Sequence, residues 1–349
     1  MKAGSIDELI LQPVSFLASA PADEADIAIS SRIRLARNIA GFPFPGRATP
    51  DVREKLRGMV KRACRSRKLR VFDIENLDEI EREVLLERRL VSRELLQSAG
   101  GAAVVVREDE RLSLMINEED QLRLQAIQPG LALPELYREI AAVEEKLSAQ
   151  LDFAFDDRLG YLCACPTNVG TGMRASVMLH LPALVLSGRI APTMQGINKL
   201  QLAVRGIYGE HTQNLGNLFQ ISNQITLGES EGQILDRIGS VISDVIKFEK
   251  ESREALLKQD RFGMLNHIGR AYGILRYSYR LGLSEALNCL SGLRAGVDMR
   301  LFPGMERSLV NRLFIGIFPG HLQKHYGEAF SGAELDIRRA EFCRRALAE

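Results

Sequence analysis

The sequence predicts an α+β fold, in which a sheet with flanking helices is followed by a helical C-terminal part. Residues 27–34 have the apolar spacing of a strand. Residues 103–106 and 112–116 form a candidate antiparallel hairpin around a charged turn. From Glu231 onward, apolar residues recur at helical spacing, and the remaining chain has only Gly and Pro breaks. We therefore expect a boundary at 235/236, between a first domain over 1–235 and a helical second domain.

Four further segments are expected to be helical. Residues 51–64 have a single apolar face, and residues 79–97 show a similar helical pattern. Pro134 suits the first turn of a helix whose apolar stripe reaches Leu147, and this helix is expected to cover the sheet. Residues 174–182 are expected to begin a helix of the same kind.

The composition is that of an ordinary soluble globular protein and argues against several classes. The 46 basic and 45 acidic residues give a net charge of +1, so no overall field attracts nucleic acid or an anionic membrane. No apolar run reaches spanning length, and the N-terminal residues lack the apolar core of a signal peptide. The five cysteines form no C-x-x-C pair, and the five histidines show no metal-ligand spacing. These features predict reduced thiols in a cytoplasmic protein, without a directly bound metal.

The central stretch, residues 165–176 (CPTNVGTGMRAS), is the first candidate site. It follows the apolar run 160–164, a candidate strand that ends in a Pro/Asn/Gly-rich turn. Glycines allow backbone to approach a ligand closely, and backbone N–H groups suit an anion. Arg174 adds a planar, permanently charged group suited to phosphate oxygens. The alternative is a tight loop with one exposed arginine.

Two arginines lie on one side of the first predicted strand. Arg32 and Arg34 are two residues apart, so their side chains share a face of the strand. Neighbouring guanidinium groups repel each other unless an anion lies between them. The pair is therefore a candidate clamp for a polyphosphate. The alternative is a pair of solvated arginines on an edge strand.

Acidic residues follow the predicted hairpin. Residues 117–123 (NEEDQLR) contain the adjacent carboxylates Glu118, Glu119 and Asp120 at the end of a strand. Three such groups are costly to hold together unless cations meet them, and a cationic substrate or Mg²⁺ would do so. The alternative is a polar turn.

A glycine-punctuated loop at residues 204–212 contains Arg205 and Glu210. The residues after it, to Gly228, are expected to be loop or strand. A loop of this kind can close over a ligand.

Together, these segments resemble the phosphagen (guanidino) kinase superfamily and, within it, the bacterial protein-arginine kinases. The motifs occur in the family's order, which makes the set far more specific than any one of them. They are SSRIRLARN (30–38), NEEDQLR (117–123), CPTNVGTGMRAS (165–176), RGIYGEHT (205–212) and GNLFQISNQITLG (216–228). The resemblance implies a catalytic domain over 1–235, built on an antiparallel sheet flanked by helices as in guanidino kinases and glutamine synthetase. A helical C-terminal domain over 236–349 follows it.

The resemblance also implies direct transfer of the γ-phosphate of ATP to a guanidinium nitrogen. Glu119 and Glu210 are then the carboxylates that grip the acceptor guanidinium, and Cys165 is the thiol beside it. Mg²⁺ arrives with ATP, and Glu118 reaches it through water. The implied ATP-binding positions are Ser30, Ser31, Arg32, Ile33, Arg34, Arg89, Arg123, Arg174, Ala175, Ser176, Val177, Met178, Arg205, Gly206, Ile207, Tyr208 and Gly209.

The resemblance favours arginine side chains of proteins as the acceptor. Kinases of small guanidino metabolites carry a helical domain before the first arginine motif, whereas 29 residues precede Ser30 here. The implied context is protein quality control under stress. The implied partners are protein substrates with exposed arginines, a second copy of the chain, a zinc-binding activator protein and a Clp protease. Two alternatives stay open: a free-arginine kinase, which residues 209–212 (GEHT) resemble more closely, and a catalytically silent adaptor of the same fold.

A last motif lies near the C-terminus. Residues 335–340 (LDIRRA) resemble the phosphoarginine-binding motif of the bacterial group, with Asp336, Arg339 and Ala340 as candidate allosteric contacts. Leu335 stands where that motif has its first arginine, which leaves the allosteric function open. Gln121 likewise stands where the superfamily usually has histidine.

Overall fold

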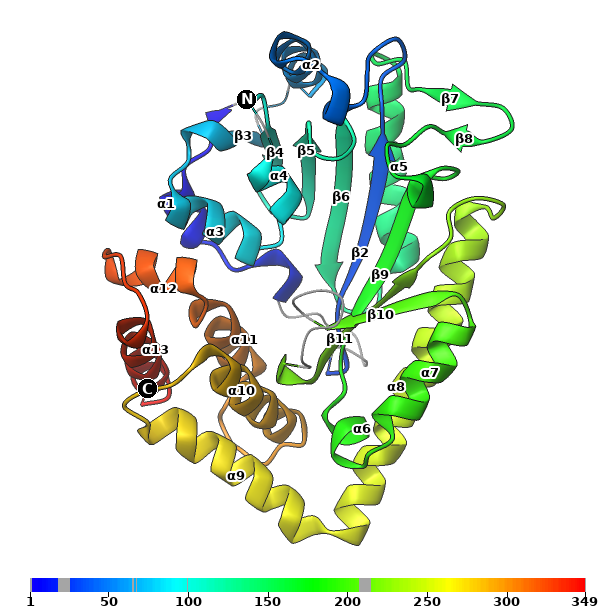
Figure 1. The fold of residues 1–349 in the computed structure, drawn as a ribbon. Helices are drawn as coiled ribbons and strands as arrows, with labels where there is room; N and C mark the ends of the chain where they lie inside the picture. The colour runs from blue at the N-terminus through cyan, green and yellow to red at the C-terminus, as the bar shows by residue number, and fades with distance from the viewer. Residues whose placement is uncertain are drawn as a thin grey trace.

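The computed structural model describes residues 2–17, 26–64, 66, 68–98, 100–206 and 215–348. One large sheet, a layer of helices on one of its faces and a group of C-terminal helices make up the fold (Figure 1). Within the described ranges, we find no helix of the length and apolarity needed to cross a membrane.

The sheet confirms the predicted fold class. Its strand order is β1-β3-β4-β5-β6-β2-β9-β11-β10, and β1 pairs in parallel with β3 while the other pairings are antiparallel. The strands are β1 (Lys2–Ala3), β2 (Ala28–Arg37), β3 (Leu69–Asp73), β4 (Ala103–Arg107), β5 (Leu112–Ile116), β6 (Leu122–Pro129), β9 (Met173–His180), β10 (Leu202–Gly206) and β11 (Leu218–Asn223). A separate hairpin of β7 (Phe155–Asp156) and β8 (Gly160–Tyr161) projects at the upper right of Figure 1.

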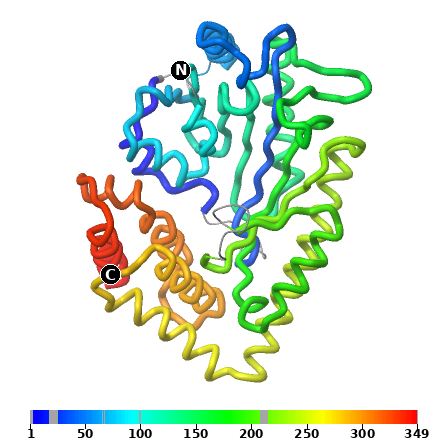
Figure 2. The backbone as a smooth tube through the Cα atoms, in the orientation of Figure 1, coloured from blue at the N-terminus to red at the C-terminus, as the bar shows by residue number. Residues whose placement is uncertain are grey.

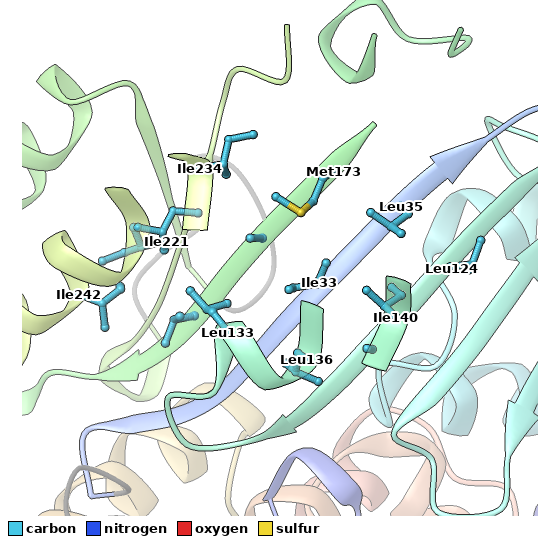
Figure 3. Close-up of a cluster of buried hydrophobic side chains, with 14 of the residues drawn as sticks. Ile33, Leu35, Leu124, Leu133, Leu136, Ile140, Met173, Ile221, Ile234 and Ile242 are labelled. Carbon is cyan, nitrogen blue, oxygen red and sulfur yellow. The ribbon is translucent and has the colours of Figure 1, made fainter. Parts of the chain in front are cut away.

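The main apolar core lies on one face of this sheet. Helices α5 (Leu133–Ser148) and α8 (Glu231–Gln259) cover the central strands there. Ile140 of α5 and Ile242 of α8 belong to the same buried cluster as Ile33 of β2 (Figure 3). Burial of each such side chain contributes about 1.5–3 kcal/mol. Three more helices contribute to this core: α2 (Pro50–Ala63), α6 (Pro182–Leu186) and α7 (Ile190–Lys199).

A smaller core lies beneath the N-terminal helices. Val104 and Val106 of β4 point into it, whereas Val105 points to the main core, as the alternation of a strand requires. The helices over this second core are α1 (Ile6–Ile10), α3 (Glu79–Glu87) and α4 (Arg93–Gln97).

The C-terminal helices form a third body with its own core. Figure 2 shows the chain leaving the sheet along α8 and turning back at the bottom of the view into the next helix. These helices are α9 (Arg261–Tyr277), α10 (Leu283–Asp298), α11 (Arg307–Gly316), α12 (Pro319–Tyr326) and α13 (Ala333–Ala346).

Polar contacts fix this helical body against α3. Glu87, the last residue of α3, accepts the backbone N–H groups of Gly320 (2.7 Å) and His321 (2.9 Å) at the start of α12. The carboxylate thus satisfies N–H groups that lack a partner inside the helix. Next to it, Arg88 forms a buried ion pair with Glu110, with 2.6 Å between Nη2 and Oε1.

Most predicted elements are confirmed. The strand predicted over 27–34 is β2, which begins at Ala28; the hairpin is β4 and β5, and the predicted helix with Pro134 is α5. The long apolar helix is α8, whose N-cap Ser230 forms a capping box with Gln233. The boundary at 235/236 falls inside α8, and the division into two domains stays a prediction.

Three expectations about local structure are wrong. Residues 174–182 form β9 and the turn into α6, because a strand buried on both faces has the continuous apolar run that a buried helix also shows. The segment 79–97 is two helices, since Arg89 adopts φ of 59° between them. The run 160–164 contributes only the two strand residues of β8.

Candidate active site

The candidate site lies on the sheet face opposite the main core. Because Ile33 points into the core, its neighbours Arg32 and Arg34 point to the other face. On β9, Ser176 stands in register with Arg32, and Arg174 with Arg34. Strand β2 is central, between β6 and β9, so the edge-strand alternative is wrong.

Two cavities open on this face and meet at Arg34 and Arg205, which line both of them. The larger cavity has a volume of about 940 Å³ and extends along β2 past Ala36. The smaller cavity has a volume of about 490 Å³ and extends the other way, past Arg32. A ligand that spans the junction therefore passes between Arg34 and Arg205.

The arginines predicted from the motifs gather around this junction. Each of them lines at least one of the cavities: Arg32, Arg34, Arg89, Arg123, Arg174 and Arg205. Two of them donate hydrogen bonds to side chains of strand β11. Arg32 Nη2 donates to Gln220 Oε1 (2.8 Å), and Arg174 Nη2 donates to Ser222 Oγ (3.1 Å).

The arginine cluster is electrostatically unfavourable without an anion. Burial, and then repulsion by Arg34, lower the pKa of Arg32 well below its ordinary value. Burial, and then repulsion by Arg123 and Arg174, lower the pKa of Arg34 to about 9. An arginine outside such a cluster keeps its charge at any physiological pH. A negative ligand relieves this repulsion, so the cluster fits a polyphosphate.

Two glutamates of the second motif pair with Arg123 but differ in burial. Glu118 is buried, with its Oε1 2.7 Å from Arg123 Nη1, and it accepts a hydrogen bond from Ser92 Oγ. Burial raises the pKa of Glu118, against the opposing effect of Arg123. Its Oε2 is buried and has no hydrogen-bond partner among the described residues. Glu119 Oε2 lies 3.2 Å from Arg123 Nη2, and its side chain is 43% exposed on the wall of the larger cavity.

The third carboxylate of this motif has a different position. Asp120 is buried, and its Oδ1 accepts from Asn38 Nδ2 and from the backbone N–H of Ala164, both at 2.7 Å. Asp120 therefore ties the loop of Cys165 to the end of β2. This tie explains why Cys165 and Glu119 line the same cavity.

The loop of Cys165 depends on two glycines. Gly170 has φ of +113°, and a Cβ there would lie 2.1 Å from Thr226 O. Gly172 has φ of +60°, and a Cβ there would lie 2.7 Å from a backbone carbonyl oxygen of β2. Close approach to the protein's own backbone explains both glycines, rather than the approach to a ligand that we expected. Cys165 Sγ lies 3.0 Å from Thr167 Oγ1 at the cavity wall.

The smaller cavity has an apolar wall. Met178 and Leu218 contribute to it from the sheet, and Phe314 contributes from α11. Arg89 lies over the ring of Phe16, with 4.8 Å from Cζ to the ring centroid. An apolar pocket that opens onto arginines suits a nucleotide, with the base against the wall and the phosphates at the charges.

Some predicted ATP-binding residues lie away from both cavities. Ile33, Ala175 and Val177 are buried in the main core on the far face of the sheet. Ser31 also faces that side, where its Oγ donates to Gly130 O at 2.8 Å. These side chains stabilise the strands that carry the arginines. Strand alternation alone predicts this, since they directly neighbour the cavity-facing residues.

The remaining predicted contacts divide into two groups. Ser30 and Ser176 are on the arginine face, in register with Met178 and Arg32 respectively, and Gly206 lines the smaller cavity. Four predicted residues lie outside the described ranges: Ile207, Tyr208, Gly209 and Glu210.

The residues of the C-terminal motif lie on α13 and are engaged within the protein. Arg339 is buried, and it donates to Ile317 O (2.9 Å), Leu281 O (2.9 Å) and Asp336 Oδ1 (2.7 Å). Ala340 is fully buried. These contacts hold α13 against its neighbouring helices. Phosphoarginine binding by this motif stays a prediction.

Comparisons with known proteins agree with this geometry. Residues 51–252 match the family described as "ATP:guanido phosphotransferase, C-terminal catalytic domain", and residues 262–349 match "Protein-arginine kinase McsB C-terminal domain". The chain is 44% identical to the protein-arginine kinase of Moorella thermoacetica over 332 residues, 93% of this chain and 95% of the relative. It is 42% identical to that of Halothermothrix orenii over 346 residues, 98% and 99% of the two chains. The fold is similar to the crystal structure of lombricine kinase, with a TM-score of 0.60, 24% identity and 72% of each chain covered.

Proposed function

The chain belongs to the ATP:guanido phosphotransferase family, and we propose that it transfers the γ-phosphate of ATP to the guanidinium of arginine side chains in proteins. One observation carries this proposal: an arginine cluster lies between an apolar cavity and a cavity lined by Glu119 and Cys165. The C-terminal match over 262–349 and the relatives named protein-arginine kinase support a protein acceptor over free arginine.

The nucleotide occupies the smaller cavity and the junction. Its base lies against the apolar wall, and its phosphates lie among the arginines. Mg²⁺ enters with ATP as part of the substrate, and the unpaired Glu118 Oε2 is suited to reach it through water. Charge spreads over the equatorial oxygens of the transferred group, so the arginines stabilise the transition state. A single well-placed arginine contributes on the order of 10³–10⁵ in rate.

The acceptor guanidinium enters the larger cavity between Glu119 and Cys165. Its ordinary pKa lies above about 12, so it must lose a proton to become a nucleophile. Glu119 orients the guanidinium and takes up this proton as the nitrogen lone pair forms the N–P bond. The bond from the γ-phosphorus to the bridging oxygen breaks, and ADP leaves with that electron pair. Glu210 supplies the second carboxylate in this scheme.

Electrostatics are sufficient to orient the acceptor. A carboxylate and a guanidinium 4 Å apart attract by about 4 kcal/mol at an effective dielectric constant near 20. Binding also holds the acceptor in line with the phosphoryl donor. The translational and rotational freedom is then lost before the reaction, which lowers the activation barrier further. The catalytic residues therefore act mainly by alignment and charge.

The proposal extends to the setting in which the enzyme acts. It works in the cytoplasm, where its five free cysteines stay reduced. Its partners are proteins with exposed arginines, a second copy of the chain, a zinc-binding activator protein and a Clp protease that receives the marked proteins. Phosphoarginine binding by Asp336, Arg339 and Ala340 adds allosteric control. These partners and this control rest on the family resemblance.

Mass spectrometry tests the acceptor. The protein is incubated with MgATP and either casein or free arginine, and we expect phosphoarginine on casein. Phosphate on free arginine alone would reverse the choice of acceptor. Binding of ATP without transfer to either acceptor would favour the silent adaptor.

A glutamine substitution tests the role of Glu119. Glu119→Gln keeps the shape of the side chain and removes its charge, so we expect transfer to fall about 10²–10⁴-fold while ATP still binds. The matched control is Glu135→Gln, since Glu135 lies exposed on α5, on the far side of the sheet. Near-normal turnover by Glu119→Gln would refute the proposed role.

A further inference from the structure

The larger cavity continues beyond Glu119 to an outer edge between β2 and α2. Phe44, residues 45–47 and Arg53 line the cavity there, and we call these five residues the basic rim. In Figure 1, α2 stands at the upper end of the sheet, whereas the C-terminal helices that line the smaller cavity stand at the lower end. The rim and the nucleotide cavity thus lie at opposite ends of the site. A polypeptide whose arginine lies at Glu119 therefore has the rim within the same cavity, on the side away from the nucleotide.

The basic rim is fixed relative to the turn that carries Glu119. In the same turn, Gln121 donates from Nε2 to Pro43 O (3.0 Å), and its Oε1 accepts a backbone N–H just beyond β2 (2.7 Å). Arg53 Nη2 donates to Pro45 O (2.6 Å). The rim is therefore formed before any ligand arrives, and binding there loses little conformational entropy.

The rim carries a positive charge that the protein itself does not balance. Arg47 is exposed, and its guanidinium makes no hydrogen bond or ion pair with a described residue. The cavity is lined by six arginines against three glutamates, and two of these, Glu118 and Glu119, already pair with Arg123. Bound ATP occupies the arginines at the junction but leaves Arg47 uncompensated. Such a potential favours negatively charged segments of an acceptor.

We propose that the basic rim binds the polypeptide on either side of the acceptor arginine, and that Arg47 selects an acidic residue close to it. This inference rests on the proposed function and names its substrate class: acceptor arginines with Asp or Glu nearby. Arg47 and Glu119 line the same cavity, and an extended chain advances about 3.3–3.6 Å per residue, so the selected carboxylate is a near neighbour of the acceptor in the substrate sequence. Phe44, whose ring is partly exposed, offers an apolar surface to the same segment. Free arginine has no flanking residues and gains nothing from the rim.

A peptide series tests this preference. Each peptide has one arginine. The peptides differ only in having Glu, Gln or Lys at one position, which is one of the two residues before the arginine or one of the two after it. Phosphoarginine formation is measured as kcat/KM with saturating MgATP. For the wild type, we expect Glu to exceed Lys by about two- to fivefold at the best position, which corresponds to the upper part of the range measured for exposed ion pairs. The preference shrinks as salt is raised.

Charge reversal at the rim gives the decisive comparison. Arg47→Glu is expected to reverse the ranking of the Glu and Lys peptides, and Arg47→Ala is expected to abolish it. The KM for ATP stays unchanged in both variants, because Arg47 lies away from the smaller cavity. The matched control is Arg138→Glu, since Arg138 is an exposed arginine of α5 on the far face of the sheet.

The outcomes separate this inference from the proposed function. If Arg47→Glu keeps the wild-type ranking, or if the wild type has no ranking, the rim does not select acidic residues. A change of ranking in Arg138→Glu as large as that in Arg47→Glu would also overturn the inference. If the wild type binds ATP but phosphorylates no peptide and no casein, the proposed function fails instead.

Discussion

Replacement of Arg34 by methionine is expected to stabilise the protein without nucleotide while it abolishes phosphoryl transfer. A pKa lowered to about 9 from the ordinary value of an arginine corresponds to about 5 kcal/mol of unfavourable interaction, at about 1.4 kcal/mol for each pKa unit. Arg34 keeps some contact with solvent, so screening reduces this figure to about 2–3 kcal/mol. The folded-state pKa lies below the unfolded-state value, so the penalty is complete below about pH 9 and fades as the pH rises from there toward the unfolded-state pKa. At neutral pH, Arg34→Met therefore removes the whole of this unfavourable interaction from the folded state.

Thermal unfolding of the nucleotide-free protein measures this effect. At about 2–4 °C per kcal/mol, we expect Arg34→Met to unfold several degrees above the wild type. MgATP should raise the unfolding temperature of the wild type more than that of the variant, because the anion relieves the repulsion only where Arg34 is present.

A second arginine of β2 provides the matched control. Arg37 is fully buried and well paired: it donates to Glu144 Oε1 (2.5 Å), Ala36 O (2.7 Å) and Thr171 O (3.0 Å). Arg37→Met leaves these groups without their partner and is expected to lower stability by about 3–5 kcal/mol. If Arg34→Met also lowers the unfolding temperature, the arginine cluster is not strained without an anion and the reasoning is refuted.

Three further predictions concern stability. Burial, and then nearby arginine charge, lower the pKa of His180 well below its ordinary value, so the wild type loses stability as pH falls below about 6.5, by up to about 1.4 kcal/mol per pH unit. His180→Gln should flatten this slope in urea unfolding measured between pH 7 and 5, and an unchanged slope would contradict the assignment. Gly170→Ala should lower both the unfolding temperature and the transfer rate, because its Cβ meets a backbone oxygen. Gly196→Ala, in an uncrowded position of α7, is its control and should be neutral or stabilising by up to about 1 kcal/mol. Arg88→Met should cost about 3–5 kcal/mol in urea unfolding, because it leaves Glu110 buried without its partner, and a loss below 1 kcal/mol would contradict this.

The periodic spacing of apolar residues predicted most of the fold. It failed for an element that is buried on both faces and therefore has no polar side. The amphipathic helices α2, α5 and α8 and the strand β2 each have one polar and one apolar side, and these were predicted. Strand β9 is buried on both faces, so Val177, Met178 and Leu179 form an apolar run without alternation. Its neighbours in the sheet decide its conformation, and they are far away in the sequence.

The sequence predicted the charged residues of the site, but it did not predict the residues that hold them in position. The order of the motifs brought Arg32, Arg34 and Glu119 to attention, and the two cavities bring them together. Asp120 and Gln121 lie in the same polar motif as Glu119. Both are buried, however, and they hold neighbouring loops in place through hydrogen bonds. These roles depend on tertiary contacts, for which the local sequence carries no periodic signal.

A crystal structure with MgADP and an arginine-containing peptide tests the central claim most directly. We predict the base in the smaller cavity, the phosphates among Arg32, Arg34 and Arg205, and the peptide guanidinium at Glu119 in the larger cavity. A nucleotide bound outside the smaller cavity, or a guanidinium on the same side of the arginine cluster as the base, would contradict the account.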